Sequence, residues 1–546
     1  MIDPREAAGK ISDLGFQLKT LGDTGILGVM RPDRTIRALL TTARGGTTPA
    51  TAIRVAAIKH PDRVSIVDEL GSLTFDQLDG RTDALAHGMA GLGVAAGDGI
   101  GIMCRNHRGF LEATLAASKL GADALLLNTM FSGPQLAEVV EREGAGVLVF
   151  DEEFEGLLSE LPDSVSRIVG FGGEGGGHPT LESLISSSDV AEVERPESES
   201  RIILLTSGTT GAPKGAQRGS PGGLAGIAGL FDRIPHRAGE VMVMPAPLFH
   251  SWGLINTVLS LTLGATVVLD RHFEPAQTMR RVDQYSADVL VAVPVMLQRI
   301  LELPAEVLDQ FRADNLKIVT LSGSALPGGL ATAWMDRFGD NIYNLYGSTE
   351  VSFVTIADPV DLRQDPATAG RPPHGTSIRL VDKDGKDVGP GETGRVFVSN
   401  GMTFDGYTGG GNKETLDGFM SSGDIGHFDS RGLFFVDGRD DEMIVSGGEN
   451  VFPAEIEDLV SGHPEVVEAT ALGVEDKEWG HRLRCFVVKT EGATIDEDGI
   501  KAYVRENLAR YKVPREVIFI DELPRNPTGK ILKRELREMA PDAGKE

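Results

Sequence analysis

The hydrophobic pattern of the first 400 residues alternates between two periods. Apolar residues recur at helical spacing in segments such as Ile53–Lys59, Gln77–Leu92 and Phe110–Leu120. Short uninterrupted apolar runs, such as Gly97–Met103 and Ala122–Leu127, are typical of buried strands. Strands separated by amphipathic helices predict an α/β fold, in which mainly parallel β-sheets are flanked by helices.

The pattern changes near residue 440. Beyond that point the chain predicts a helix, two strands, a helix and a strand, over Pro453–Val460, Val466–Val474, Arg484–Lys489, Asp496–Leu508 and Glu516–Ile520. A basic helix is expected to start at Lys530, and the whole unit has a normal domain size of about 100 residues. We therefore expect a lead segment over 1–50, a large domain over 51–440 and a small α+β domain over 441–546, joined by a hinge.

Composition narrows the classes of partner. Of 546 residues, 41% are hydrophobic, which is enough for a large core, and the formal net charge is −27. An acidic surface repels nucleic acid, so no nucleic-acid partner is expected. It also repels phosphorylated small molecules, so any phosphate site must rest on a local cluster of glycine, lysine and arginine.

The cysteines and the N-terminus indicate a cytoplasmic protein. Cys104 and Cys485 are too few for a disulfide framework or a cysteine-based metal site, and apolar surroundings predict that both are buried. The charged N-terminus is not a secretory signal, and no apolar run reaches the roughly 18 residues of a membrane span. Residues 18–40 mix apolar and basic side chains. A helix packed on the main body is favoured there, and peripheral membrane contact is the alternative.

A glycine-dense segment, GFGGEGGG at Gly170–Gly177, satisfies the G-x-G-x-x-G spacing of dinucleotide sites. It follows a predicted strand, Ser166–Val169, but runs into His178 and Pro179 instead of opening a helix. Because the pattern is weak without that helix, we interpret the segment as a flexible loop.

The strongest chemical signal is the segment TSGTTGAPKG, which follows an apolar strand, Ile202–Leu205. Glycines allow close backbone approach, hydroxyls donate hydrogen bonds and the lysine adds positive charge, as a bound triphosphate requires. It is not a Walker A loop, because no G-x-x-x-x-G-K-[ST] string occurs. The predicted ATP-binding residues here are Thr206, Ser207, Gly208, Thr209, Thr210, Gly211 and Lys214.

This loop resembles the signature of the acyl-adenylate-forming superfamily of AMP-binding enzymes, which includes acyl-CoA synthetases, peptide-synthetase adenylation domains and beetle luciferases. Further motifs follow in the family's order up to Lys530: APLFHSWGL, LSGSAL, YNLYGSTE, SSGDIGHFD, GRDDEMIVSGGENVFPAEIE and PRNPTGK. The segment PLFHSWG and the overall spacing most resemble bacterial fatty acyl-CoA synthetases. The stretch GYTGGGNKET after Tyr407 departs from the family's usual aromatic and proline pattern.

The resemblance implies a role for each motif. Polar loops at strand ends are where open α/β sheets bind ligands. By resemblance, the nucleotide is bound by Gly323, Ser324, Ala325, Tyr346, Gly347, Asp424 and Arg439. Tyr346 would stack on adenine, Asp424 would bind the ribose and Arg439 the ribose or a phosphate. Thr349 would contact the α-phosphate, and Glu350 would hold Mg²⁺, which prefers oxygen ligands.

The remaining motifs are implied to bind the acid and coenzyme A. The acyl pocket would contain His250, Trp252 and Gly253. His250 is grouped with the catalytic residues, although no general base is needed because a carboxylic acid is ionised at neutral pH. The small domain would turn about Asp441 and bring Ser446, Gly447 and Gly448 to the pantetheine tunnel. Lys530 would bridge the carboxylate and the α-phosphate during adenylation.

These roles imply an ATP-dependent acid–thiol ligase. A carboxylate, expected to be a medium- or long-chain fatty acid, would react with MgATP to give acyl-AMP and pyrophosphate, and coenzyme A would then take the acyl group. A fatty acyl-AMP ligase that loads a carrier protein and an aryl or other carboxylate-CoA ligase are the alternatives. A silent adenylate-binding module would be expected to lack Lys530, Glu350 or Asp424, and a hydrolase motif is absent from the sequence. Whether the protein forms a homodimer stays open.

Overall fold

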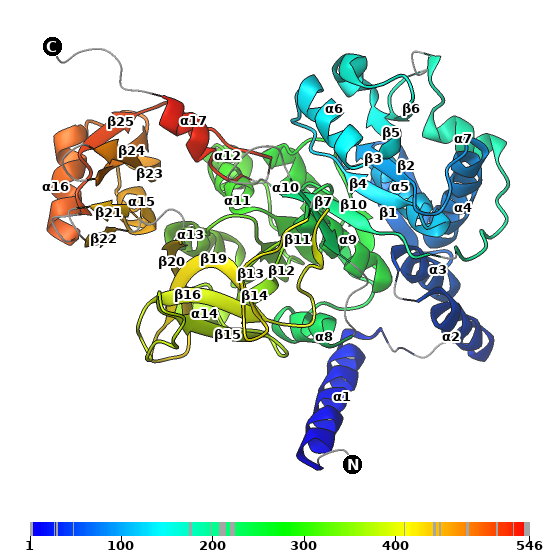
Figure 1. Ribbon diagram of the computed structural model, residues 1–546, viewed down its shortest axis with the longest axis horizontal. Helices are drawn as coiled ribbons and strands as arrows, with labels where there is room; N and C mark the ends of the chain where they lie inside the picture. The colour runs from blue at the N-terminus through cyan, green and yellow to red at the C-terminus, as the bar shows by residue number, and fades with distance from the viewer. Residues whose placement is uncertain are drawn as a thin grey trace.

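The computed structural model of the protein describes residues 4–26, 28, 31–46, 48–173, 177–196, 198–206, 214–218, 224–408, 410–440, 444–446, 449–451, 453–476, 480–508, 512–527 and 529–539. A large N-terminal part contains three β-sheets, and a small C-terminal part contains a fourth (Figure 1). The predicted α/β class, with a large domain followed by a small α+β domain, is therefore confirmed.

The first sheet of the large part has eight strands, and its interior is parallel. In spatial order they are β14 (Ser352–Ala357), β13 (Ile342–Ser348), β12 (Ile318–Leu321), β11 (Val289–Ala292), β9 (Val241–Val243), β10 (Thr266–Val268), β1 (Val64–Asp68) and β2 (Gly71–Thr74). Only the two edges are antiparallel, where β2 pairs with β1 and β14 pairs with β13. Buried apolar strands of this kind are expected when helices cover both faces.

The second sheet has seven strands and a parallel centre. Its order is β17 (Gly406–Tyr407), β8 (Lys214–Arg218), β7 (Ile202–Thr206), β4 (Asp123–Leu126), β3 (Gly99–Met103), β5 (Ala145–Asp151) and β6 (Ser166–Phe171). Antiparallel pairing is confined to β7, β8 and β17. The predicted glycine-dense loop begins inside β6, and α7 (Leu181–Ser187) is the next α-helix among the described residues. Residues 174–176 lie outside the described part.

Helices cover both sheets. They are α3 (Pro49–Lys59), α4 (Phe75–Gly91), α5 (Arg108–Leu120), α6 (Gly133–Arg142), the 3₁₀ segment η1 (Glu152–Glu160), α7 (Leu181–Ser187), α8 (Leu224–Arg233), α9 (Ser251–Thr262), α10 (Pro275–Gln284), α11 (Pro294–Leu301), α12 (Ala305–Leu308), α13 (Gly328–Phe338) and α14 (Pro359–Gln364). Helix α5 is buried along nearly its whole length and contacts β1 of the first sheet and β3 and β4 of the second. Small residues such as Ala113, Ala116 and Ala117 permit that close packing.

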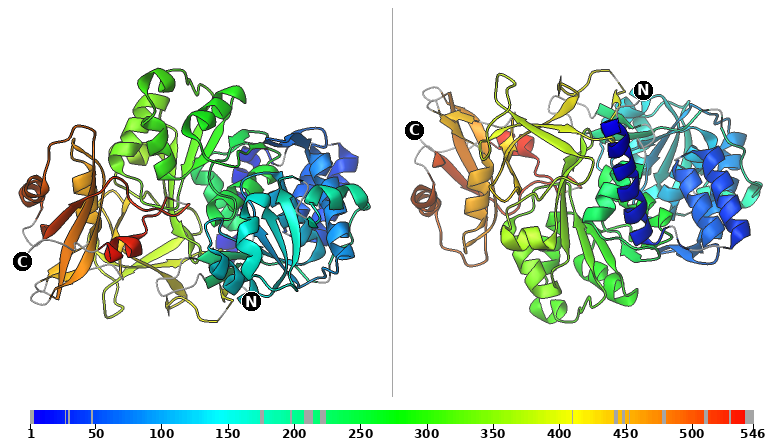
Figure 2. Two further views of the ribbon diagram at one scale, coloured as in Figure 1. Left: turned by 90° about the horizontal axis from the view of Figure 1, so that it is seen from above. Right: turned by 90° about the horizontal axis from the view of Figure 1, so that it is seen from below.

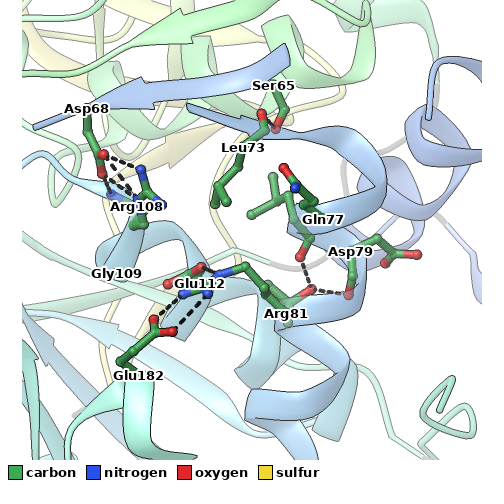
Figure 3. Close-up of polar contacts among 12 residues, drawn as sticks. Ser65, Asp68, Leu73, Gln77, Asp79, Arg81, Arg108, Gly109, Glu112 and Glu182 are labelled. Atoms are coloured by element: carbon green, nitrogen blue, oxygen red, sulfur yellow. Dashed lines mark hydrogen bonds and ion pairs between the residues drawn. The ribbon is translucent and has the colours of Figure 1, made fainter. Parts of the chain in front are cut away.

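Ion pairs connect α5 to β1 of the first sheet and to the neighbouring helix α4 (Figure 3). Arg108 at the start of α5 donates from Nε to Asp68 Oδ2 at the end of β1, over 3.0 Å. Arg81 of α4 contacts Glu112 of α5 at 2.6 Å and also pairs with Glu182 of α7. The carboxylates of Asp68 and Glu112 are almost fully buried, so each needs its arginine to offset the loss of water.

The third sheet is antiparallel, which the sequence pattern did not predict. It is built from β15 (Ser377–Val381), β16 (Gly394–Ser399), β18 (Thr415–Leu416), β19 (Phe419–Phe428) and β20 (Phe434–Arg439). Short turns at residues 417–418 and 429–433 join β18 to β19 and β19 to β20, whereas longer loops precede β16 and β18. An antiparallel pair needs only a short turn, whereas a parallel pair needs a long crossover.

The small part follows the predicted order of elements. It contains β21 (Ile444–Ser446), β22 (Glu449–Val451), α15 (Pro453–Ser461), β23 (Val466–Asp476), β24 (Gly480–Lys489), α16 (Glu497–Asn507), β25 (Glu516–Phe519) and α17 (Lys533–Glu538). The expected helix start at Lys530 is wrong. Lys530 lies in a loop closed by the Arg525–Ile531 bridge, in which Asn526 donates its N–H to the Lys530 carbonyl. The exact domain boundaries stay a prediction.

The N-terminal segment forms two helices instead of one. Helix α1 (Pro4–Thr24) ends before Gly25, and α2 (Pro32–Gly45) begins at a proline, which favours a helix start. Leu21 of α1 packs against Phe231 and Leu263, and Phe16 stacks on His374. The N-terminal end of α1 projects from the large part (Figures 1 and 2). Among the helices of the described residues, none is both long and apolar enough to span a bilayer.

Candidate active site

A continuous cavity of about 2230 Å³ lies where the three large-part sheets and the small part meet. One end, which we call the nucleotide end, is lined by Lys214, Tyr346, Glu350, Asp424 and Arg439. The other, which we call the apolar arm, is lined by Ile227, Phe231, Trp252, Ile255, Val258 and Leu259. Lys530 of the small part also lines this cavity, so residues more than 300 positions apart face the same space.

The ends of β12 and β13 form one wall of the nucleotide end. The loop after β12 turns at Gly323, whose φ is +94°, and exposes the adjacent backbone of Ser324 and Ala325 to the cavity. In β13 a Cβ on Gly347 would lie 1.9 Å from the Ser352 carbonyl oxygen. Only glycine fits there. The segment predicted as a loop after a strand is itself strand up to Ser348, where β13 pairs with β14.

Tyr346 and Asp424 meet beside this wall. The Tyr346 hydroxyl donates to Asp424 Oδ2 at 2.5 Å and lies 3.3 Å from Ser422 Oγ. One face of its ring stacks on Phe434, with centroids 5.7 Å apart. Burial, followed by the nearby Asp424 carboxylate, raises the pKa of Tyr346 well above its usual value, so the hydroxyl remains a donor.

Asp424 is also paired with Arg439 across two neighbouring strands. Asp424 in β19 lies directly opposite Arg439 in β20, and Arg439 Nη1 donates to Asp424 Oδ1 at 3.0 Å. The carboxylate is therefore held by a phenol and a guanidinium while its residue borders the cavity. A buried, fixed carboxylate can accept two hydroxyl hydrogen bonds, which suits a ribose.

Glu350 and Lys214 both lie against Tyr407. Tyr407 donates its hydroxyl to Glu350 Oε1 at 2.9 Å, and Lys214 Nζ lies 5.4 Å from the centre of the Tyr407 ring. Burial, together with the Glu350 carboxylate, raises the pKa of Tyr407. Since Tyr407 occupies only Oε1, the second carboxylate oxygen of Glu350 suits a hard cation such as Mg²⁺. Thr349, the adjacent residue, also lines the cavity.

The predicted phosphate loop lies mostly outside the described residues. Its two ends are described: Thr206 at the end of β7 pairs in register with Lys214 at the start of β8. Ser207, Gly208, Thr209, Thr210 and Gly211 belong to the undescribed part. The β7–β8 hairpin nevertheless delivers Lys214 to the cavity, on the same side as Glu350.

His250 marks the junction between the nucleotide end and the apolar arm. His250 immediately precedes α9. The segment that leads to it is fixed by Asn106, whose side-chain amide donates to the carbonyls of Met244 and Ala246. His250 Nε2 is shielded from water and has no hydrogen-bond partner among the described residues. Burial lowers the pKa of His250 to about 4, so the imidazole is neutral at physiological pH.

The two other predicted pocket residues fix α9. Trp252 donates its indole N–H to the Ala292 carbonyl at 3.0 Å, and its ring packs between two parts of the core. A Cβ on Gly253 would lie 2.3 Å from the Pro247 carbonyl oxygen. Glycine therefore allows the first turn of α9 to approach the preceding loop, which places His250 and Trp252 at the cavity.

The loop of Lys530 rests on the large part. A Cβ on Gly529, whose φ is +78°, would lie 2.5 Å from Val295 Cγ1 at the start of α11. The neighbouring Lys530 side chain is exposed to the cavity. Ser446 ends β21. The predicted hinge residue Asp441 and loop residues Gly447 and Gly448 lie outside the described part.

Sequence reasoning missed several residues that shape the site. Tyr407 links Glu350 to Lys214, although the sequence only marks it as the last residue before an irregular stretch. That stretch contributes Lys413, which lines the cavity near Arg439. Phe434 supports the Tyr346 ring, and Asn106 supports the His250 segment. None of these lies in a recognisable motif, and only their spatial neighbours identify them.

A second polar cluster lies away from the cavity. Ligand atoms of Cys104, His107 and Asp151 lie within 4.8 Å of one another, and all three residues are buried. Both imidazole nitrogens are already engaged, because Nδ1 accepts the Gly109 N–H and Nε2 pairs with Asp151. Burial raises the pKa of Cys104 well above its usual value. The cluster therefore caps α5 and leaves no nitrogen for a metal.

Comparison with known proteins identifies the family. Residues 53–408 match the AMP-binding enzyme family, and residues 455–530 match the AMP-binding enzyme C-terminal domain. Indoleacetate–CoA ligase of Aromatoleum aromaticum is 33% identical over 88% of this chain and 94% of its own. 2-Succinylbenzoate–CoA ligase of Geobacillus kaustophilus is 32% identical over 91% of this chain and 99% of its own.

Solved structures agree with this. The o-succinylbenzoate CoA synthetase of Bacillus subtilis, in complex with its acyl-adenylate intermediate, has a TM-score of 0.78 and 27% identity, covering 90% of this chain and 98% of that one. ATP-bound MatB of Rhodopseudomonas palustris has a TM-score of 0.80 and 25% identity, covering 90% and 99%. The chain thus belongs to the AMP-binding enzyme family of the acyl-adenylate-forming superfamily, in its class of AMP-forming CoA ligases.

Proposed function

We propose that the protein is an AMP-forming CoA ligase whose acid carries an aromatic ring. The observation that carries this proposal is the apolar arm, which starts at His250 and Trp252 and is lined further in by Phe231. Apolar and aromatic side chains with few polar groups suit a flat ring. Relatives with 30% identity or more carry names for indoleacetate, ferulate and 2-succinylbenzoate.

This proposal replaces the fatty acid that the motif PLFHSWG favoured with the aryl alternative. That motif forms the turn before α9 and the start of the helix, where any carboxylate substrate would pass. It therefore does not discriminate among acids. The side chains deeper in the arm do, and they carry no motif.

In the first step the acid's carboxylate oxygen would attack the α-phosphorus of ATP, and pyrophosphate would leave with the electron pair of the broken P–O bond. Lys530 and Lys214 would oppose the negative charge on the carboxylate and phosphates. Asp424 would hold the ribose, and Tyr346 would offer adenine its ring face away from Phe434. Glu350 would hold Mg²⁺, which supplies charge neutralisation to the phosphates when bound.

In the second step the sulfur of coenzyme A would attack the acyl carbon and release AMP. Lys530 lines the cavity here, an arrangement that suits the first step. The small domain would therefore turn about Asp441 before the second, to bring Ser446, Gly447 and Gly448 to the acyl-adenylate. The neutral imidazole of His250 would face the carboxylate without taking its proton, since the acid is already ionised.

The test is a substrate panel with ATP and CoA, in which AMP, pyrophosphate and thioester are all measured. Indole-3-acetate, ferulate, 2-succinylbenzoate, benzoate, octanoate, palmitate and acetate form the panel, and Lys530→Ala is the inactive control. We expect an aromatic acid to have a kcat/KM at least about tenfold above those of octanoate and palmitate. Gaining or losing one or a few methylene contacts in an apolar pocket changes kcat/KM by at least about this factor. A preference for octanoate or palmitate would contradict the aromatic assignment.

One further acceptor has a specific reason to be tested. A fatty acid–[acyl-carrier-protein] ligase of Streptomyces coeruleorubidus is 28% identical over 88% of this chain. Pyrophosphate release without thioester, followed by acyl transfer to an added carrier protein, would assign the protein to that type of acceptor instead of coenzyme A.

A further inference from the structure

Helix α2 presents an apolar face to solvent. Ile36, Leu39 and Leu40 have exposed fractions of 60%, 65% and 49%. Their spacing places all three on one side of the helix, opposite the buried Ala38. Scattered exposed aliphatic residues need no explanation, but three on one helix face form a contiguous patch. We call these three residues the α2 patch.

The charge around the α2 patch differs from that of the rest of the chain. Residues 1–46 contain seven lysines or arginines and five acidic residues, whereas the whole chain carries −27. Arg37 and Arg44 lie along one flank of the α2 patch at helical spacing, and within the described residues neither forms an ion pair. An apolar helix face with basic residues along its flank complements a surface that has anionic groups outside and an apolar layer beneath them.

Helix α1 carries two further exposed leucines, and residues of both α1 and α2 line the cavity of the active site. Leu14 and Leu18 are exposed by 55% and 54%, one helical turn apart. On its other side α1 is attached to the large part, because Phe16 stacks on His374 at 3.9 Å and Leu21 packs on Phe231. Leu21 and Ile26 line the far end of the apolar arm, and Thr42 and Gly46 at the end of α2 also line the cavity.

We propose that α1 and α2 dock the enzyme on an anionic lipid membrane, with the α2 patch inserted among the acyl chains and Arg37 and Arg44 against the lipid phosphates. The membrane would then face the end of the cavity that receives the apolar part of the acid, and the protein would lie on the membrane surface without crossing it. A second copy of the chain is the competing occupant. It is disfavoured because two copies of this face would bring Arg37 and Arg44 of each against the other. The proposal does not depend on which acid is activated.

Vesicle co-sedimentation of the full chain tests this proposal. The vesicles are phosphatidylcholine alone, or phosphatidylcholine with about one third phosphatidylglycerol, a charge density that attracts basic segments. The wild type is expected to bind the anionic vesicles and to dissociate as salt rises from about 0.05 M to about 0.5 M. The variant Ile36→Gln/Leu39→Gln/Leu40→Gln is expected to bind at least about tenfold more weakly, since three inserted aliphatic chains are lost.

A matched control replaces three exposed aliphatic residues elsewhere. Leu70, Val190 and Val360 are exposed by 61%, 68% and 63%, and the triple glutamine variant of these is expected to bind vesicles as the wild type does. Arg37→Gln/Arg44→Gln is expected to lose the anionic preference and most of the salt dependence. Ligase activity on a water-soluble acid is expected to be unchanged in all variants, because none of these residues lines the cavity.

Three outcomes would overturn the proposal. The first is that the wild type and Arg37→Gln/Arg44→Gln each bind neutral and anionic vesicles equally well. The second is that the wild type binds neither kind of vesicle. The third is that the wild type is a dimer and that only the α2 patch variant is a monomer. The last would assign the face to a second copy, and size-exclusion chromatography with light scattering detects it. An inactive enzyme that still binds vesicles would contradict the proposed function alone.

Discussion

The two ends of the cavity are built in different ways. At the nucleotide end, polar residues from the sheets of the large part are connected by hydrogen bonds, as among Tyr346, Asp424 and Arg439. In the apolar arm, side chains of α8, α9 and the end of α1 meet through packing alone. Directional hydrogen bonds fix the position of each polar group, whereas packing tolerates exchange of one aliphatic residue for another. The first end is therefore suited to an invariant cofactor and the second to a variable acid.

The largest effect should come from removing the cation at the junction of the two ends. Lys530→Ala is expected to slow acyl-adenylate formation about a thousandfold, because the charge opposite the phosphates is lost. Transfer from preformed acyl-adenylate to CoA should be nearly unchanged, and separate assays of the two half-reactions measure this. Lys501→Ala on α16, which removes a lysine paired with Glu497, is the matched control. Equal losses in both half-reactions would rule out the assigned role.

A smaller effect is expected within the nucleotide end. Asp424→Ala should raise the KM for ATP about fiftyfold, because charge-assisted hydrogen bonds to the ribose are each worth about 1.5–3 kcal/mol. The KM for the acid should change little. Steady-state kinetics with each substrate varied in turn distinguishes these. If both KM values rise together while the melting temperature falls, Asp424 supports the fold and not the nucleotide.

His250 allows the junction to be probed through pH. Its pKa is about 4 in the folded protein and about 6.5 when unfolded, so below pH 6.5 only the unfolded state gains the proton. Stability contributed by the neutral imidazole is present above pH 6.5 and is lost as pH falls toward 4. Between pH 7 and pH 5 this amounts to about 2 kcal/mol.

The variant His250→Gln should therefore lose less stability on acidification than the wild type, by about that amount. Urea denaturation at pH 7 and at pH 5 measures the difference. His60→Gln is a useful comparison, because burial also lowers the pKa of His60 to about 4 although it does not line the cavity. Wild-type pH dependence in His250→Gln would show that the imidazole reaches water.

The smallest effect should appear in the apolar arm. Val258→Phe adds volume to the lining and is expected to reduce kcat/KM for the bulkiest accepted acid about tenfold, while the KM for ATP stays constant. Val360→Phe, at an exposed position outside the cavity, is the control. A change in the KM for ATP as large as that for the acid would mean that the two ends are not independent.

The same contrast explains what could be predicted from sequence. Helices and strands of the parallel sheets follow from periodicity, since burial on one or both faces leaves a clear pattern in the residues. Many residues of the nucleotide end fall in short motifs that resemble those of a known family. That resemblance singled out Glu350, Asp424 and Lys530, and all three line the cavity. Their chemical roles stay predictions.

Other parts could not be predicted, for physical reasons. Strand β18 of the third sheet and strand β17 of the second have two residues each, too few to show a period. Tyr407 acquires its place only when β17 pairs with β8, a contact between residues almost 200 positions apart. Lining residues of the apolar arm, such as Phe231 and Val258, are ordinary core residues in sequence, so the acid could not be identified from them.

The contact between Gly529 and Val295 has a consequence for timing. Gly529 and Lys530 are consecutive, so under the proposed rotation the residue that rests on the large part and the residue that lines the cavity would arrive together. The movement that would deliver the cation would also complete a wall of the cavity, and the charge would be present only when the reaction space is closed. A side chain at position 529 would collide with Val295, keep that wall open and displace Lys530 from the cavity. The absence of a side chain at Gly529 would thus couple the proposed closure to the proposed reaction.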